Sequence, residues 1–420
     1  MKKNKKEKSY KDKILGLNPY LLFLPFLFLY IAIILAFSKN AFQGDEGRYI
    51  FFAKNLLHGY YSPPPPDINL WNGPGYPLLI APFMFFKLPL IVLRLFNGLL
   101  LYLSLIISYK TVSMYSSKKS AFLSTILLGL YFPIFQMLPL ILTEVLTWFL
   151  ITLLCFLFAK SFNKKIISWK LLFLTTFLLA FLAMTKVIFG YVILSMIFVS
   201  IFMLVFPQFR SSAKKSTLIF LLSFVFCLPW LLYTYNLTNN FFYWTNSGSM
   251  SLYTMSTPYE NELGDWSSSV ELNLNPNHKV FIDSISNLNA LQRDKAFKKK
   301  AIENIYNHPK KYFSNWTANI GRLVFSYPYS YGEQTIKTYF TIIPNMFVIV
   351  FILLAAVIGI VRYNKLPIEL ILLLLFILIY LFGSSLVSAY RRMFYITIPF
   401  WILFLSYVFT NLITIKFRKK

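Results

Sequence analysis

Apolar segments of roughly 20 residues recur along almost the whole chain, and they restrict its fold more than any other feature. Hydrophobic residues make up 57% of the 420 residues. A helix of about 20 apolar residues is long enough to cross the ~30 Å hydrocarbon core of a bilayer. We therefore predict an all-α polytopic membrane protein rather than a soluble domain. The ten predicted spans are 19–37, 88–109, 120–136, 142–159, 171–185, 187–206, 216–235, 339–361, 366–382 and 393–413.

The formal charge of +26 is distributed in a way that indicates membrane topology. Clusters of Lys and Arg alternate with the predicted spans, from seven lysines before the first span to the cluster at 416–420. This alternation follows the positive-inside rule, so these clusters and both termini are predicted to be cytoplasmic. Twelve of the 15 acidic residues then fall on the opposite, outward side. The charge is therefore explained without nucleic-acid binding.

The predicted topology divides the chain into three parts. Residues 1–235 form an N-terminal transmembrane catalytic module that includes a first outward loop, 38–87. Residues 236–338 form a large extracytoplasmic loop, which is rich in Asn, Ser, Asp and Lys. Residues 339–420 form the C-terminal transmembrane helices. Interfacial or amphipathic helices are expected at 50–57 and 76–86 in the first loop, and at 294–307 and 312–325 in the large one.

Charged side chains gather at the outward ends of the predicted spans, where charge near a bilayer usually marks a functional site. They are Asp45 and Glu46 after the first span, Arg94 in the second, Glu144 at the start of the fourth, Lys186 after the fifth, and Arg391 and Arg392 before the tenth. A carboxylate can act as general base toward a hydroxyl. Cations can stabilise a leaving phosphate. A lipid-linked sugar phosphate is a substrate that needs both.

The stretch Asp45-Glu46-Gly47-Arg48-Tyr49 resembles the Asp-Glu-x-Arg-Tyr motif in the first loop of the C-type superfamily of membrane glycosyltransferases. The nearest resemblance is to the protein O-mannosyltransferase-like and lipid A aminoarabinose transferase families. Further matching features follow in order: Asn72-Gly73-Pro74-Gly75-Tyr76-Pro77-Leu78, Arg94, Glu144, Lys186, Pro229-Trp230, His308-Pro309-x-x-Tyr312 and Arg391-Arg392 with Pro399-Phe400. The family often carries an Arg-Asn pair shortly after Pro-Trp, whereas this chain has Tyr233 and Tyr235-Asn236.

The resemblance implies an inverting glycosyltransferase of the hexosyl or pentosyl type. The donor is a polyprenyl-phosphate-linked sugar, and the acceptor is a hydroxyl on a lipid, glycan or protein. Asp45 is the expected base, with Glu46 as the second catalytic carboxylate. Lys186, Arg391 and Arg392 are expected to bind the donor phosphate. The expected supporting residues are Arg48, Tyr49, Tyr76, Arg94 and Glu144.

No cofactor or metal is predicted, because the chain shows no clustered His and Cys ligands. A divalent ion held by Asp45, Glu46 and Glu144 is an open alternative. The resemblance also implies an integral protein of the bacterial inner membrane, with its active site on the extracytoplasmic side.

Other interpretations of the same residues stay open at this point. Asp45 and Glu46 could be a solvated loop pair, Arg94 a structural ion-pair partner, and Lys186 an anchor that reaches the membrane surface. At the level of function, the alternatives are a transporter or flippase of lipid-linked sugars, and a non-catalytic scaffold. A transporter would concentrate its charges and broken helices near mid-membrane, whereas here the charges lie at one face.

Overall fold

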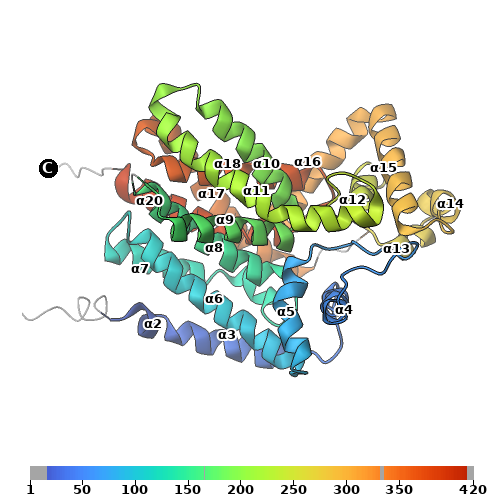
Figure 1. The fold of residues 1–420 in the computed structure, drawn as a ribbon, viewed down its shortest axis with the longest axis horizontal. Coiled ribbons are helices and arrows are strands. Elements are labelled where there is room, and N and C mark those ends of the chain that lie inside the picture. Colours follow the sequence, from blue (N-terminus) through green and yellow to red (C-terminus); the bar gives the residue numbers. More distant parts are fainter. Residues whose placement is uncertain (1–16, 165, 332–334, 414–420) are drawn as a thin grey trace, which may run out of the picture.

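The computed structural model describes residues 17–164, 166–331 and 335–413, and all regular structure in these ranges is helical (Figure 1). The predicted fold class is therefore confirmed. The N-terminal lysines, Lys165, Glu333 and the basic cluster at 416–420 lie outside the described residues.

The α-helices are α2 (Pro19–Leu22), α3 (Leu24–Phe37), α4 (Glu46–Leu57), α5 (Gly75–Phe85), α6 (Leu90–Val112), α7 (Lys118–Gly129), α8 (Thr143–Phe162), α9 (Trp169–Thr185), α10 (Ile188–Met203), α11 (Arg210–Thr238), α12 (Gly248–Met255), α13 (Ser269–Leu274), α14 (Pro276–Ser284), α15 (Ala290–Asn307), α16 (Pro309–Phe325), α17 (Tyr339–Val361), α18 (Ile368–Ser385), α19 (Arg392–Tyr395) and α20 (Ile398–Asn411). Short 3₁₀ helices lie at Phe132–Met137, Pro207–Phe209, Ile336–Thr338 and Tyr363–Lys365.

Five helical segments within the described ranges are long and apolar enough to cross a bilayer. They are Leu90–Val112, Thr143–Phe162, Pro207–Thr238, Ile336–Val361 and Ile368–Ser385. Shorter apolar helices fall in four of the other predicted spans, namely α3, α9, α10 and α20. The chain is thus an integral membrane protein, and the number of ten spans stays a prediction.

Two predicted spans are interrupted where proline removes a backbone donor. The segment 19–37 is divided at Phe23 into α2 and α3, two residues before Pro25. The segment 120–136 is not one helix, because α7 ends at Gly129 and a 3₁₀ helix with Pro133 follows. A proline lacks the N–H that an α-helix needs and its ring clashes with the preceding turn. The prediction of uninterrupted helices was wrong at these two places, and also at 393–413, where residues 396 and 397 separate α19 from α20.

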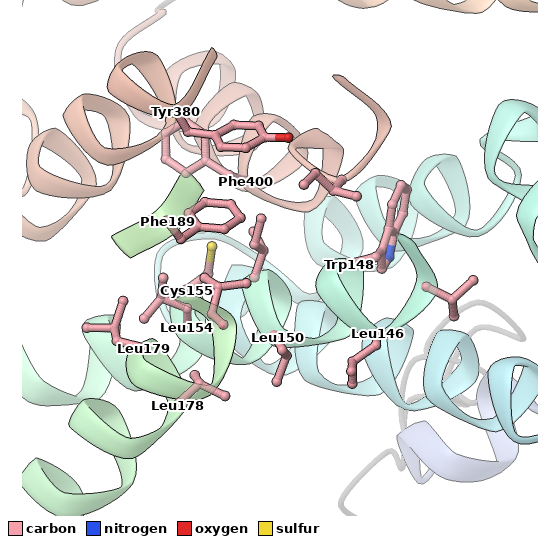
Figure 2. Close-up of a cluster of buried hydrophobic side chains, with 14 of the residues drawn as sticks. Leu146, Trp148, Leu150, Leu154, Cys155, Leu178, Leu179, Phe189, Tyr380 and Phe400 are labelled. Carbon is pink, nitrogen blue, oxygen red and sulfur yellow. The ribbon is translucent and has the colours of Figure 1, made fainter. Parts of the chain in front are cut away.

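A buried apolar core joins the middle of the chain to its C-terminal helices (Figure 2). Phe189 of α10 stacks on Tyr380 of α18, with ring centroids 4.5 Å apart. Trp148 and Cys155 of α8 are buried in the same cluster. Aromatic packing of this kind stabilises by burial and by ring geometry together. It fixes α8, α10 and α18 relative to one another, and the ends of these three helices form the site described below.

Helices α12 to α16 gather at the end of the molecule opposite to the start of α2 and the end of α20 (Figure 1). The amphipathic helices expected at 294–307 and 312–325 correspond to α15 and α16, separated at His308. A buried polar cluster around Glu262 ties this region together. Burial raises the pKa of Glu262, but hydrogen bonds from His278, Thr257 and Asn277 outweigh this effect and hold the pKa at about 2. The carboxylate is therefore ionised and acts as a structural acceptor.

Candidate functional site

A cavity of about 610 Å³ opens where several helices end, and charged side chains line it. Its walls come from the start of α4, the start of α8, the break between α9 and α10, the end of α18, and the segment before α19. The charged lining residues are Asp45, Arg48, Glu144, Lys186 and Arg392. Helices from distant parts of the chain thus bring six of the predicted site residues to one place, these five and Tyr49.

Asp45 is positioned by the turn that begins α4. Gly44 has a φ of +55°, a left-handed conformation that glycine adopts without steric cost, and Asp45 follows as the residue that caps the helix. One Asp45 oxygen accepts from Arg48 at 3.1 Å, and the other accepts from Arg392 at 3.1 Å. A carboxylate has about four acceptor sites, so capacity is left for an incoming hydroxyl.

Glu144 and Lys186 form the opposite part of the charged network. Lys186 Nζ lies 3.0 Å from Glu144 Oε1, and Arg392 Nε lies 3.7 Å from the same oxygen. The second oxygen, Oε2, is buried and has no hydrogen-bond partner. Arg392 therefore lies between Asp45 and Glu144 and contacts both.

The conformation around Lys186 depends on two glycines of the first outward loop. Lys186 is the residue that ends α9, and α10 begins two residues later. Gly73 and Gly75 lie directly against Met184 and Thr185; a Cβ on Gly75 would come within 2.6 Å of the Thr185 backbone nitrogen. Side chains at these positions would push the loop off the end of α9. The Asn-Gly-Pro-Gly segment thus holds the loop against the break that carries Lys186.

Arg48 joins Asp45 to the neutral polar and aromatic side chains that complete this part of the cavity. Arg48 lies 5.1 Å from the ring centroid of Trp71 and 3.5 Å from the Asn72 side-chain oxygen. Asn72 in turn donates to the Tyr49 hydroxyl at 3.3 Å. Burial, followed by the charges of Glu144 and Asp45, raises the pKa of Tyr49 well above its usual value. Its phenol therefore stays protonated and can donate a hydrogen bond.

Glu46, predicted as a catalytic carboxylate, lies behind the cavity and does not line it. Its side chain is fully buried and accepts from the backbone N–H groups of Gln43 and Ile141, each at 2.7 Å. Arg94 lies 3.5 Å from it and donates to the Lys39 carbonyl at 2.5 Å. This geometry gives Glu46 and Arg94 a structural part, in which they join the first loop to α6 and to the turn before α8.

Arg391 and Tyr76 also lie away from the cavity. Arg391 donates to Gln136 at 3.0 Å and points toward the packing between α17 and α19 rather than toward Asp45. The Tyr76 ring packs edge-on against Tyr49, with centroids 5.1 Å apart, and supports that ring from behind. A direct contact of either residue with substrate therefore has no geometric support.

The residues present give little basis for a metal ion held by Asp45, Glu46 and Glu144. Both oxygens of Glu46 already accept backbone hydrogen bonds, and a guanidinium occupies the space between Asp45 and Glu144. Within residues 17–164, 166–331 and 335–413, no group of three His, Cys, Asp or Glu side chains is placed to hold a metal.

Several lining residues were not singled out from the sequence. Trp266 comes from the large loop, and Tyr390, Ser384 and Ser388 come from the end of α18 and the segment after it. Tyr390 lies 5.2 Å from the Arg392 guanidinium, measured to the ring centroid. Tyr390 could have been predicted from the sequence, because it directly precedes Arg391-Arg392. Trp266 has no such signal, because only the fold brings residue 266 near α4.

The fold and the cavity define a polytopic membrane protein with a charged site at one end of its helices. Residues 52–243 match the family described as dolichyl-phosphate-mannose-protein mannosyltransferase. The matched stretch runs from α4 through α11 and includes Glu144 and Lys186. The predicted resemblance to the C-type superfamily of membrane glycosyltransferases is thereby confirmed. No curated protein matches the chain.

Two solved structures are similar in overall arrangement. One is the archaeal oligosaccharyltransferase AglB from Archaeoglobus fulgidus in complex with an inhibitory peptide and a dolichol-phosphate, with 12% identity and a TM-score of 0.49 over 95% of this chain. The other is the Archaeoglobus fulgidus oligosaccharyltransferase tethered to an acceptor peptide, with 13% identity and a TM-score of 0.46 over 92% of this chain. The chain spans about half the length of these proteins, 50% and 49%.

Proposed function

We propose that this chain is an inverting glycosyltransferase that moves a sugar from a polyprenyl-phosphate-sugar donor to an acceptor hydroxyl. The observation that carries the proposal is the cavity in which Asp45 faces the same space as Lys186 and Arg392. The name of the matched family includes a lipid-phosphate sugar, dolichyl-phosphate-mannose, which supports this donor class. The sugar is a hexose or a pentose, and the acceptor is a lipid, a glycan or a protein.

In the proposed reaction Asp45 takes the proton from the acceptor hydroxyl. The acceptor oxygen forms a bond to the anomeric carbon of the sugar, and the bond from that carbon to the phosphate oxygen breaks. The lipid phosphate leaves with the electron pair of the broken bond. A single displacement of this kind inverts the anomeric centre and needs one base. Asp45 fits this role because its carboxylate lines the cavity, whereas both oxygens of Glu46 already accept hydrogen bonds from backbone N–H groups.

The leaving phosphate would be stabilised by Lys186 and Arg392. Three cations line the cavity, Arg48, Lys186 and Arg392, against the two carboxylates of Asp45 and Glu144. An incoming phosphate would therefore meet a surplus of positive charge. Preorganised cations of this kind stabilise charge that develops in the transition state.

The competing proposal is a transporter or flippase of lipid-linked sugars. It would require charged groups and interrupted helices around a site near mid-membrane. The charged cavity here lies at helix ends, which favours chemistry at the membrane surface. Movement of a lipid-linked sugar across vesicles without sugar transfer would support the transporter instead.

Loss of the phosphate-binding cations is expected to weaken use of the donor. Each of Lys186→Ala and Arg392→Ala should lower transfer roughly ten- to a hundredfold, because hydrogen bonds to charged groups are worth about 1.5–3 kcal/mol. The measurement is transfer in membranes with a panel of undecaprenyl-phosphate sugars. Arg391→Ala is the matched control, and its transfer should fall less than that of Arg392→Ala because Arg391 lies off the cavity. Wild-type rates in both Lys186→Ala and Arg392→Ala would show that the phosphate binds elsewhere.

Sidedness can be tested with single cysteines on a background whose own two, Cys155 and Cys227, are buried. We propose that the charged cavity faces the extracytoplasmic side of a bacterial inner membrane. Val280 of α14 is 82% exposed, so Val280→Cys should react with an impermeant thiol reagent in intact cells. The exposed Lys119 in the first turn of α7 should react as Lys119→Cys only after permeabilisation. Reaction of both from the same side would contradict the proposed topology.

A further inference from the structure

The charged cavity lies next to two further cavities that share some of its lining residues or one another's. A cavity of about 310 Å³ shares Arg48, Trp71 and Trp266 with the charged cavity. It also shares Asn69, Trp71, Met250 and Ser269 with a third cavity of about 630 Å³, which we call the outer cavity. Trp71 lines all three. The three cavities therefore lie next to one another, from Asp45 to the region between the first outward loop and α15.

The outer cavity has a lining that differs from that of the charged cavity. Four asparagines line it, namely Asn69, Asn246, Asn287 and Asn289. The charged lining residues are Asp67, Arg293 and Asp294, so the lining has two acids against one arginine and no surplus of positive charge. An amide offers both donors and acceptors, as a sugar hydroxyl does, which suits hydrogen bonding to uncharged polyols. One arginine beside two acids is a poor setting for an anionic acceptor.

Asn246 supplies an independent sign of a ligand. The residue is only 8% exposed, it lines the outer cavity, and its side-chain oxygen Oδ1 has no hydrogen-bond partner. Its backbone N–H is fixed by the Leu70 carbonyl at 3.1 Å, so its position is set by the loop that also carries Trp71. A buried polar atom without a partner is unfavourable because it has lost its hydrogen bond to water, and a ligand that donates to it restores a hydrogen bond.

We propose that the outer cavity is the acceptor subsite and that it takes an uncharged carbohydrate chain. This inference rests on the proposed function. The asparagines would bind sugar hydroxyls, with Asn246 Oδ1 accepting from one of them. The half-buried rings of Trp71 and Trp266, which both line the cavity of about 310 Å³, would contact the apolar faces of the sugars. The hydroxyl that becomes glycosylated would then reach Asp45.

The test is binding of the purified full chain, without donor, to an array of neutral oligosaccharides, acidic oligosaccharides and Ser/Thr-containing peptides. We expect binding to neutral oligosaccharides. Asn246→Leu and Trp71→Ala should weaken it about tenfold, the loss of one or two hydrogen bonds or contacts. Asn273→Leu, at an exposed α13 residue away from these cavities, is the matched control and should bind as wild type does. Asn246→Ser and Trp71→Phe are milder variants, which keep the proposal testable if the larger changes lower the melting temperature.

The outcomes separate this inference from the proposed function. Wild-type protein that turns over the lipid donor but prefers peptides, prefers acidic glycans or binds none of these overturns the carbohydrate subsite alone. Oligosaccharide binding that is unchanged in all four variants overturns it as well. Protein that binds oligosaccharides through Asn246 and Trp71, yet never transfers a sugar to any of them from any donor, overturns the glycosyl transfer instead.

Discussion

We expect Asp45→Asn to fold, to insert and still to bind the lipid donor, but to turn over at most about a hundredth as fast as wild type. Asparagine keeps the shape of the side chain but cannot take a proton from a hydroxyl at neutral pH. Loss of a general base costs about 10²–10⁴-fold in rate. The measurement is single-turnover transfer in detergent with saturating donor. Because both Asp45 oxygens contact guanidinium groups, donor binding must be measured on the same samples.

The matched control is Asp283→Asn, which removes an exposed carboxylate on α14 that lines none of the cavities described above. Its rate should equal that of wild type. Full transfer activity in Asp45→Asn would exclude Asp45 as the base and would mean that another group takes the proton from the acceptor. Loss of donor binding along with the rate would mean that Asp45 mainly holds Arg392 in place.

The fold was predictable where one strong physical constraint acted alone. Long apolar segments have few alternatives to helices in a bilayer, so the positions of α6, α8, α17 and α18 followed from hydropathy. Breaks inside apolar segments were harder, because proline is tolerated in some membrane helices. Pro229 lies inside the continuous helix α11, whereas Pro25 and Pro133 accompany interruptions. Tertiary packing decides whether a helix continues through a proline or is interrupted there, and this packing cannot be deduced from the local sequence.

The sequence predicted which residues form the site better than it predicted how those residues are arranged. Spans of alternating direction bring Asp45, Glu144, Lys186 and Arg392 to one end, and charge beside a bilayer marked each of them. Neighbours in sequence could not be ranked, since Glu46 lies next to Asp45 but faces away once α4 begins. The same holds for Arg391. The outer cavity could not be predicted at all, because it depends on how residues 246–297 fold back over the first loop.

Glu46→Gln is expected to destabilise the protein more than any other single change at this site. The substitution leaves the buried Arg94 without its carboxylate partner. It also replaces one carboxylate oxygen by an amide NH₂ group, so that one of the two backbone N–H groups that donate to Glu46 loses its acceptor. Breaking a buried ion pair by removing one partner costs about 3–5 kcal/mol. We therefore expect a clear fall in melting temperature in detergent, with a loss of donor binding that follows the loss of folded protein.

The control for Glu46→Gln is Glu303→Gln, which breaks the 2.8 Å pair between Lys300 and Glu303 on the exposed face of α15. Exposed pairs are screened by water, so its melting temperature should barely change. The double variant Glu46→Gln with Arg94→Met should recover part of the lost stability, because it removes the unpaired buried charge. Recovery should be incomplete, since one backbone N–H still lacks its acceptor. If Glu46→Gln keeps the wild-type melting temperature but loses single-turnover transfer, Glu46 acts on the substrate as the first-loop motif implies, and the structural part given to it here is wrong.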